Sequence, residues 1–224
     1  MPTAKKASPK PISSRGSYKF LRVCRKHFPG PVVENIAFAY DLSKYGHHKQ
    51  IRDNGDRYFD HPRAVALILI RELGIFDCDL IISLLLHDMP EDSFLLNEYR
   101  IHQLFGNHVS QIVWLLTKQK IHKGKGVQKY FKRLYESNNW WAMLAKCLDR
   151  LHNMRTLHPR PRDKQLAQVK ETREKVLPLL DILDNIIPRK YTKQINYVRK
   201  CLTYLCDHYE NSSEPAKLTK RMIV

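Results

Sequence analysis

Residues 80–86 form a nearly continuous apolar run, and ionisable side chains follow it directly. At 3.6 residues per turn this run has no polar face, so it predicts a buried helix, expected over residues 77–88. Pro90 predicts that the helix stops or bends there. The polar side chains behind the run are those of His87, Asp88, Glu91 and Asp92. Burying them without a partner would be costly, so the fold must supply a group that compensates them.

Other segments also carry apolar residues at helical spacing, and none shows the alternation of a half-buried strand. Helices are expected over residues 31–46, 61–73, 97–119, 127–137, 140–157, 162–183 and 193–210. Pro62 favours a helix start, and Gly106 predicts a bend within residues 97–119. Without Asn-Gly hairpins or an internal repeat, the sequence predicts an all-α protein with a single domain.

Length and composition bound the organisation of the chain. The 224 residues, 43% of them hydrophobic, are enough for one well-buried globular core. Residues 1–17 are rich in Pro, Ser and Lys and predict a mobile basic tail, followed by a domain over 18–190. Residues 191–224 are expected to form a C-terminal helical extension with a basic tail. No apolar segment approaches the roughly 20 residues of a membrane span, and five scattered cysteines indicate reduced thiols in a cytoplasmic protein.

The formal net charge is +17, which favours polyanionic partners such as nucleotides or nucleic acid. Much of this charge can equally be a solvated surface and a basic tail. The sequence contains no RNP aromatic signature, no C2H2 spacing and no Gly-rich phosphate loop, which disfavours a nucleic-acid role. The charge therefore favours a phosphate-bearing partner in general and identifies none in particular.

Polar residues also occur inside other apolar helices. Asp149 lies between Leu148 and Leu151, and Asn153 and Thr156 follow it on the same stripe of the expected helix 140–157. Another imidazole, that of His61, lies at the start of the expected helix 61–73, directly before Pro62. Taken singly, a histidine beside a proline is commonly a cap, and an Asp-Arg pair is commonly a surface salt bridge.

The combination favours a metal. His61, His87, Asp88 and Asp149 place two imidazoles and two carboxylates on buried helices. A divalent ion is the simplest common partner, because it keeps carboxylates ionised and imidazoles neutral and so removes the cost of burying them.

Three ordered segments carry a resemblance: "HHKQIRDNGDRYFDHPRAVA", "LLLHDMPEDS" and "LDRLHNMRTL". They resemble successive motifs of the HD-domain hydrolases of the RelA/SpoT family, over about residues 40–185. Those enzymes remove the 3′-pyrophosphate from guanosine tetra- and pentaphosphate alarmones. Within this family the chain resembles the small stand-alone alarmone hydrolases. The resemblance implies an HD-type helical bundle that hydrolyses alarmones to GDP or GTP plus pyrophosphate in the stringent response.

The resemblance also implies roles for particular residues. It assigns one divalent ion, Mn²⁺ in the family, to the same four ligands, His61, His87, Asp88 and Asp149. The ligand types alone leave iron and zinc open. It assigns water orientation and proton transfer to Glu91 and Asp92. Substrate binding falls to Arg52 against the purine, to Asn54 in the same loop, and to Asn153 and Thr156 at the sugar and phosphate.

Departures from the family pattern leave the base open. Lys49 replaces a glycine, Asn54 a small residue, Arg57 a common proline and Leu148 an alanine. Adenosine alarmones, or a phosphatase action on another nucleotide such as NADPH, therefore stay as alternatives. A nucleic-acid- or partner-binding protein on an HD fold is a third, although it would have no need for an intact ligand set. The sequence leaves open whether a toxic synthetase partner exists and whether the protein serves as its antitoxin.

Overall fold

The computed structural model describes residues 14–53, 55–92, 96–118 and 126–211. Within these ranges every regular element is a helix, and the only strand-like feature is an isolated bridge between Ile51 and Arg57. The helices are α1 Ser14–Cys24, α2 Gly30–Gly46, α3 Asp60–Leu67, α4 Cys78–Leu86, α5 Met89–Asp92, α6 Glu98–Leu116, α7 Gly126–Glu136, α8 Trp140–Arg155, α9 Arg162–Glu171, α10 Leu177–Ile186 and α11 Thr192–Asn211. The predicted all-α fold is confirmed.

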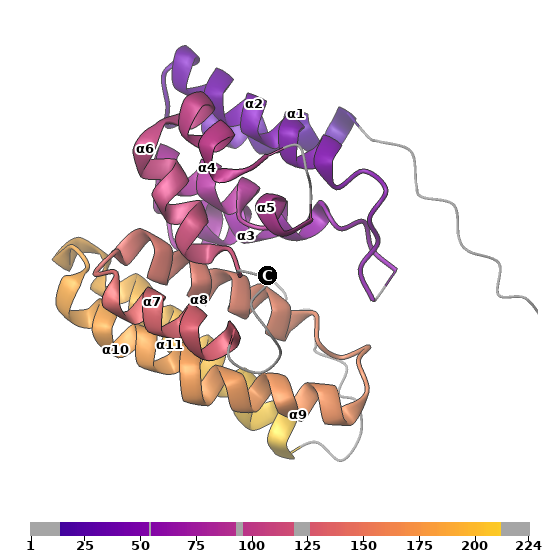
Figure 1. The fold of residues 1–224 in the computed structure, drawn as a ribbon, viewed down its shortest axis with the longest axis vertical. Helices are drawn as coiled ribbons and strands as arrows, with labels where there is room; N and C mark the ends of the chain where they lie inside the picture. Colours follow the sequence, from indigo (N-terminus) through magenta and orange to yellow (C-terminus); the bar gives the residue numbers. More distant parts are fainter. Residues whose placement is uncertain (1–13, 54, 93–95, 119–125, 212–224) are drawn as a thin grey trace, which may run out of the picture.

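The helices form two groups that meet along α8 (Figure 1). One group contains α1 to α6, in which α4 packs against α2, α3 and α6. The other contains α7 to α11, in which α8 packs against α10 and α11. Helix α8 also contacts α3, α4 and α6, and a single hydrophobic cluster runs through both groups. The described chain is therefore one domain, and α8 is the element that joins its two halves.

The apolar run of residues 80–86 forms most of helix α4, at the centre of the first group of helices. Every residue from Leu80 to Leu86 is buried, because neighbouring helices cover all sides of the helix. Asp77 caps its start by accepting a hydrogen bond from the backbone N–H of Leu80 at 2.9 Å. The helix ends at Leu86, and the short helix α5, which contains Pro90, turns away behind it. The predicted stop or bend is confirmed, and it leaves the polar residues at the end of a core helix.

Some elements differ from the predicted ranges. The segment 61–73 ends in a π-helical turn, Ile68–Glu72. The segment 162–183 is split by another, Thr172–Val176, which ends two residues before Pro178, a residue without a backbone N–H to donate. Gly106, with φ of 85° and ψ of 175°, makes the predicted bend in α6. Each break interrupts a helix without ending the apolar face that packs on the core.

The N-terminal boundary also differs. Helix α1 begins at Ser14, inside the range predicted for the tail, and the sequence analysis expected no helix there. Phe20 and Cys24 anchor it in the core, while Lys19 and Arg22 face outward. The remainder of the predicted tails, residues 1–13 and 212–224, lies outside the described residues. In the described ranges all five cysteines are free thiols, and none of the helices is long and apolar enough to cross a membrane.

Candidate active site

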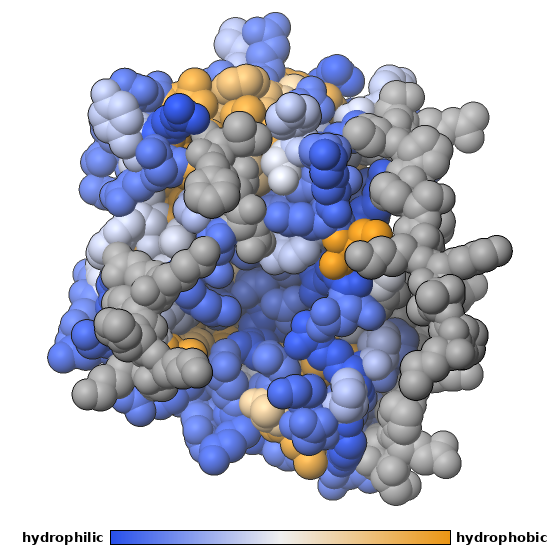
Figure 2. Space-filling view, turned by 45° about the vertical axis from the view of Figure 1, so that its right-hand side comes forward, coloured by the Kyte–Doolittle hydropathy of each residue, from blue (hydrophilic) through white to orange (hydrophobic). Residues whose placement is uncertain are grey.

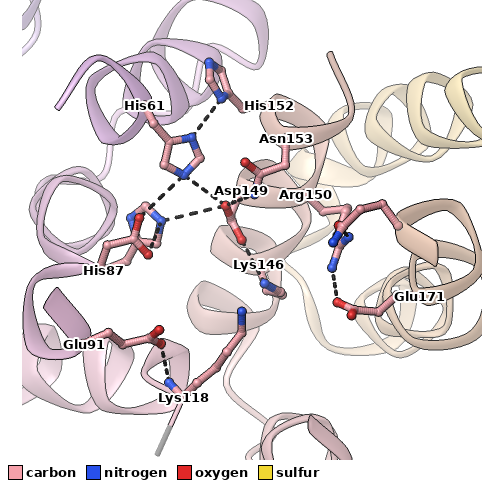
Figure 3. Close-up of polar contacts among 12 residues, drawn as sticks. His61, His87, Glu91, Lys118, Lys146, Asp149, Arg150, His152, Asn153 and Glu171 are labelled. Atoms are coloured by element: carbon pink, nitrogen blue, oxygen red, sulfur yellow. Dashed lines mark hydrogen bonds and ion pairs between the residues drawn. The ribbon is translucent and has the colours of Figure 1, made fainter. Parts of the chain in front are cut away.

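The four predicted metal ligands converge from three helices (Figure 3). His61 lies in the first turn of α3, His87 and Asp88 follow α4, and Asp149 lies on α8. The ligand atoms of His61, His87 and Asp88 all lie within 4.8 Å of one another. Asp149 Oδ1 lies 3.1 Å from His61 Nε2 and 3.9 Å from His87 Nε2. Segments far apart in the sequence therefore present two imidazoles and two carboxylates to one point.

His87 supplies the test of whether these residues fit a metal. Its Nδ1 donates to the carbonyl oxygen of Leu84 at 2.8 Å, so its Nε2 carries a free lone pair. That Nε2 is buried and has no hydrogen-bond partner among the residues that the structure describes. Such an orphaned nitrogen beside the carboxylates of Asp88 and Asp149 is costly alone but suits a divalent ion. The residues fit a metal centre.

The two carboxylates are held in the ionised form. Burial alone would raise the pKa of Asp149, but the ammonium group of Lys146, the largest opposing influence, outweighs it, and the pKa lies well below its usual range. Lys146 Nζ donates to Oδ2 at 2.8 Å, and Asn153 Nδ2 donates to Oδ1 at 2.7 Å. The pKa of Asp88 is likewise lowered, and the hydroxyl of Tyr58 donates a hydrogen bond to its Oδ2 at 3.0 Å. Both acids are thus ready to ligate a cation.

The imidazole of His61 is neutral, because burial lowers its pKa. Its Nδ1 lies 2.8 Å from Nδ1 of His152, a partly buried residue of α8. His152 was not among the residues predicted for the site. A signal was available, because His152 follows Asp149 by three residues and so lies on the same face of α8.

Glu91 lies in α5 beside this centre. One of its carboxylate oxygens accepts a hydrogen bond from the backbone N–H of Lys118. Burial raises the pKa of Glu91, which brings the group closer to the range of a general acid or base. Asp92 ends the same short helix, but its side chain lies outside the described part of the chain. The structure thus brings Glu91 to the site and does not test the side chain of Asp92.

A polar cavity of about 330 Å³ opens beside the ligands. Arg52, Asn153 and Thr156, three of the predicted substrate contacts, line it together, while Asn54 lies outside the described residues. Hydrophilic side chains gather around a recess on this side of the molecule (Figure 2). The other cations that line the cavity are Lys118, Lys146, Arg150 and Arg160. The sequence indicated a phosphate partner without identifying these four.

Arg52 is connected to the metal ligands. Its Nη2 donates to Asn153 Oδ1 at 2.8 Å, and Asn153 in turn donates to Asp149. The Nη1 of Arg52 is buried, with no hydrogen-bond partner within the described ranges. A chain of hydrogen bonds therefore runs from the Arg52 loop to α8.

Arg150, next to Asp149, is not the surface residue that an Asp-Arg pair usually indicates. It is only 4% exposed and donates to Gln168 and Glu171 on α9 (Figure 3). These contacts hold α9 against α8 and complete the far wall of the cavity. Asp149 thus faces the other predicted ligands, whereas the adjacent Arg150 faces α9.

Residues 39–176 match the HD-domain family, and the chain belongs to that family. Its resemblance to the RelA/SpoT branch is confirmed by the relatives that it matches. It is 38% identical over 151 residues to a GTP pyrophosphokinase (rsh) of Brucella ovis, covering 65% of this chain and 20% of that protein. It is 32% identical over 165 residues to a probable GTP pyrophosphokinase of Mycobacterium leprae, covering 71% of this chain and 20% of that protein.

The chain spans about a fifth of the length of these curated relatives. Its fold also matches a solved structure described as a metazoan ortholog of SpoT that hydrolyzes ppGpp and plays a role in starvation responses. That match has a TM-score of 0.63 at 22% identity and covers 77% of this chain and 96% of the other. The family-matched residues lie within the predicted domain 18–190, whose boundaries stay a prediction.

Proposed function

We propose that this protein is a metal-dependent hydrolase that removes the 3′-pyrophosphate from guanosine alarmones of the (p)ppGpp type, giving GDP or GTP. The observation that carries the proposal is the convergence of His61, His87, Asp88 and Asp149 around the orphaned Nε2 of His87. A cavity lined by several cations, suited to a polyphosphate, adjoins these groups. The relatives named pyrophosphokinases and the ppGpp-hydrolysing SpoT ortholog support a guanosine nucleotide as substrate.

We assign one divalent ion, Mn²⁺, to the four ligands. When bound there, it supplies a lowered pKa for a ligating water and polarisation of a phosphoryl oxygen. Lys146 and Asn153 hold the Asp149 carboxylate in place, and the Leu84 carbonyl fixes the ring of His87. Free thiols and a nucleotide substrate agree with a cytoplasmic protein.

The remaining residues carry out the proton and phosphate chemistry. Water attacks the phosphorus attached to the ribose 3′ oxygen, and the bond between that phosphorus and the 3′ oxygen breaks. Glu91, paired with Asp92 in this role, takes a proton from the water, and the pair returns one to the 3′ oxygen of the ribose. Lys118 and Lys146 line the cavity on the side of Glu91 and Asp149, where they stabilise charge on the departing pyrophosphate.

The other wall of the cavity suits the nucleoside. Arg52, Asn153 and Thr156 line this wall. We assign the guanidinium of Arg52 to the purine, and Asn153 and Thr156 to the sugar and phosphate region. This contact does not choose between purines, because every purine presents a π face. The choice of base stays with groups at its edge.

One assay tests the proposal: purified protein with Mn²⁺, a panel of guanosine and adenosine 3′-pyrophosphates plus NADPH, and separation of the products. We expect GDP or GTP and pyrophosphate from the guanosine alarmones, and no product after chelation of the metal. Release of phosphate from NADPH alone would contradict the proposal, and preference for the adenosine compounds would move it to the other base. A parallel incubation with ATP and GTP checks for pyrophosphokinase activity, which this site is not expected to show.

A further inference from the structure

We propose that His152 is a positioning residue that fixes the tautomer and orientation of His61 by accepting a hydrogen bond from its Nδ1–H. The proposal rests on the metal centre proposed above and adds a residue that does not touch the metal. It concerns which nitrogen of His61 carries the ring proton, and how the ring is oriented toward a cation.

The contact between the two rings is short and specific. Nδ1 of His61 and Nδ1 of His152 lie 2.8 Å apart, and the ring planes are inclined by 54° (Figure 3). At that distance one nitrogen must donate a proton and the other must accept it. The pair therefore has only two neutral arrangements, which place the shared proton on one ring or on the other.

A bound cation selects one arrangement. The Nε2 of His61 lies 3.1 Å from Asp149 Oδ1 and 3.7 Å from Asp88 Oδ2, at the point where the predicted ligands converge. Because a carboxylate oxygen can only accept, these contacts favour a proton on Nε2 while no ion is bound. A cation bound there needs the lone pair of Nε2, and the ring proton of His61 then belongs on Nδ1. The reverse arrangement would direct an N–H group at the ion.

His152 meets the requirements of the acceptor. An imidazole that accepts at Nδ1 carries its own ring proton on Nε2. The second ring nitrogen of His152 points away from His61 (Figure 3). His152 also lines a second cavity of about 410 Å³, together with Leu67 and Ile68. A cavity of that size has room for water, which can accept the Nε2–H of His152.

A neutral acceptor also suits the charge of the site. Many ligand histidines are oriented by a carboxylate, but here Asp88 and Asp149 already bring two negative charges close together. A third carboxylate would add repulsion while the metal is absent. The imidazole of His152 orients His61 without that charge.

The test is the binding of Mn²⁺ alone, measured by titration calorimetry on the full chain without substrate. The variants are His152→Phe, which fills similar space without an acceptor, and His152→Asn, whose Oδ1 can take the place of Nδ1. We expect His152→Phe to bind Mn²⁺ about 10- to 100-fold more weakly and His152→Asn to stay within a few-fold of the wild type. His108→Phe is the matched control, because His108 pairs with Asp79 outside the site, and its affinity should not change.

Two outcomes overturn the proposal: wild-type affinity in His152→Phe, or an equal loss in both variants, which would indicate packing alone. If His152→Phe fails to fold, nitrogen NMR of ¹⁵N-histidine-labelled wild-type protein with Zn²⁺ decides the question. It should show the proton on Nδ1 of His61 and on Nε2 of His152, and the opposite tautomers would overturn the proposal. Failure to bind any divalent ion in the wild type would instead remove the proposed metal centre.

Discussion

Both carboxylate oxygens of Asp149, a proposed metal ligand, are held by hydrogen bonds, one from Lys146 and one from Asn153. Asp149→Asn keeps the size of the side chain but removes the charge that a divalent ion requires. We expect the variant to bind Mn²⁺ more than about 100-fold more weakly and to lose nearly all hydrolysis. Elemental analysis and calorimetry measure the metal, and Asp79→Asn serves as the control. Full occupancy in Asp149→Asn would refute its role as a ligand.

Glu91 is expected to act in proton transfer and not in the binding of metal or substrate. Glu91→Gln, alone or with Asp92→Asn, should retain Mn²⁺ and substrate but turn over about 100- to 10,000-fold more slowly, because proton transfer is lost. Burial raises the pKa of Glu91, so kcat/KM of the wild type should fall as the pH drops through that raised value and the carboxylate becomes protonated. The Gln variant should lack this acidic limb. Normal turnover by the double variant would mean that the pair is only surface charge.

Arg52 should anchor the purine without selecting it. We expect Arg52→Ala to raise KM for guanosine and adenosine alarmones alike, since stacking and cation–π attraction contribute about 1 to 3 kcal/mol with either base. Lys49→Gly, in the same region of the sequence, should change the ratio of the two substrates and leave Mn²⁺ binding intact. Steady-state kinetics on both substrates measures this. An Arg52→Ala effect confined to one base would place the base elsewhere in the cavity.

Between elements, Arg155 on α8 is clamped to Glu72 in the π-helical turn behind α3. Two hydrogen bonds of 2.7 and 2.8 Å join the guanidinium to both carboxylate oxygens, and Arg155 is only 6% exposed. Lysine cannot reproduce this two-point contact, so we expect Arg155→Lys to lower the free energy of unfolding by about 1.5 to 3 kcal/mol. Urea unfolding of the metal-free protein measures the change.

The control for this clamp is Arg173→Lys. Arg173 pairs with Asp207 and Glu210 at the surface, where water screens the charges. Its loss should cost no more than about 1 kcal/mol. If both substitutions lowered the free energy of unfolding equally, the contact between Arg155 and Glu72 would stabilise the packing of α8 on α3 no more than a surface ion pair does.

At the scale of the whole molecule, the proposed metal ligands come from both groups of helices. His61, His87 and Asp88 belong to the group α1 to α6, and Asp149 belongs to α8. An ion bound only by the folded chain at about 100 times its Kd should add about 2.7 kcal/mol of stability, or about 5 to 10 °C in Tm for a chain of this size. Calorimetric scans with Mn²⁺ and with a chelator measure the shift. Asp149→Asn should show none, and an unchanged Tm in the wild type would argue against a bridging ion.

The sequence by itself determined the helices and the cost of burying the polar residues within them. The helical period is local, so the apolar run 80–86 predicted a buried helix whatever the rest of the chain did. The same run made the polar groups at its end conspicuous and pointed to a compensating partner. The buried polar residues gave four candidate ligands, and the family resemblance implied the same set. The structure brings His61, His87 and Asp88 together and places Asp149 beside both imidazoles.

Only the tertiary structure decided which side chains stand around that point. His152 meets His61 across 91 positions of sequence, and Lys146 is a site cation because α8 directs it inward with Asp149. The packing of helices determines which distant residues become neighbours, and the local order of apolar and polar residues does not specify that packing. For the same reason the charge of +17 indicated phosphate in general, whereas the fold selected Lys118, Lys146, Arg150 and Arg160 to line the cavity.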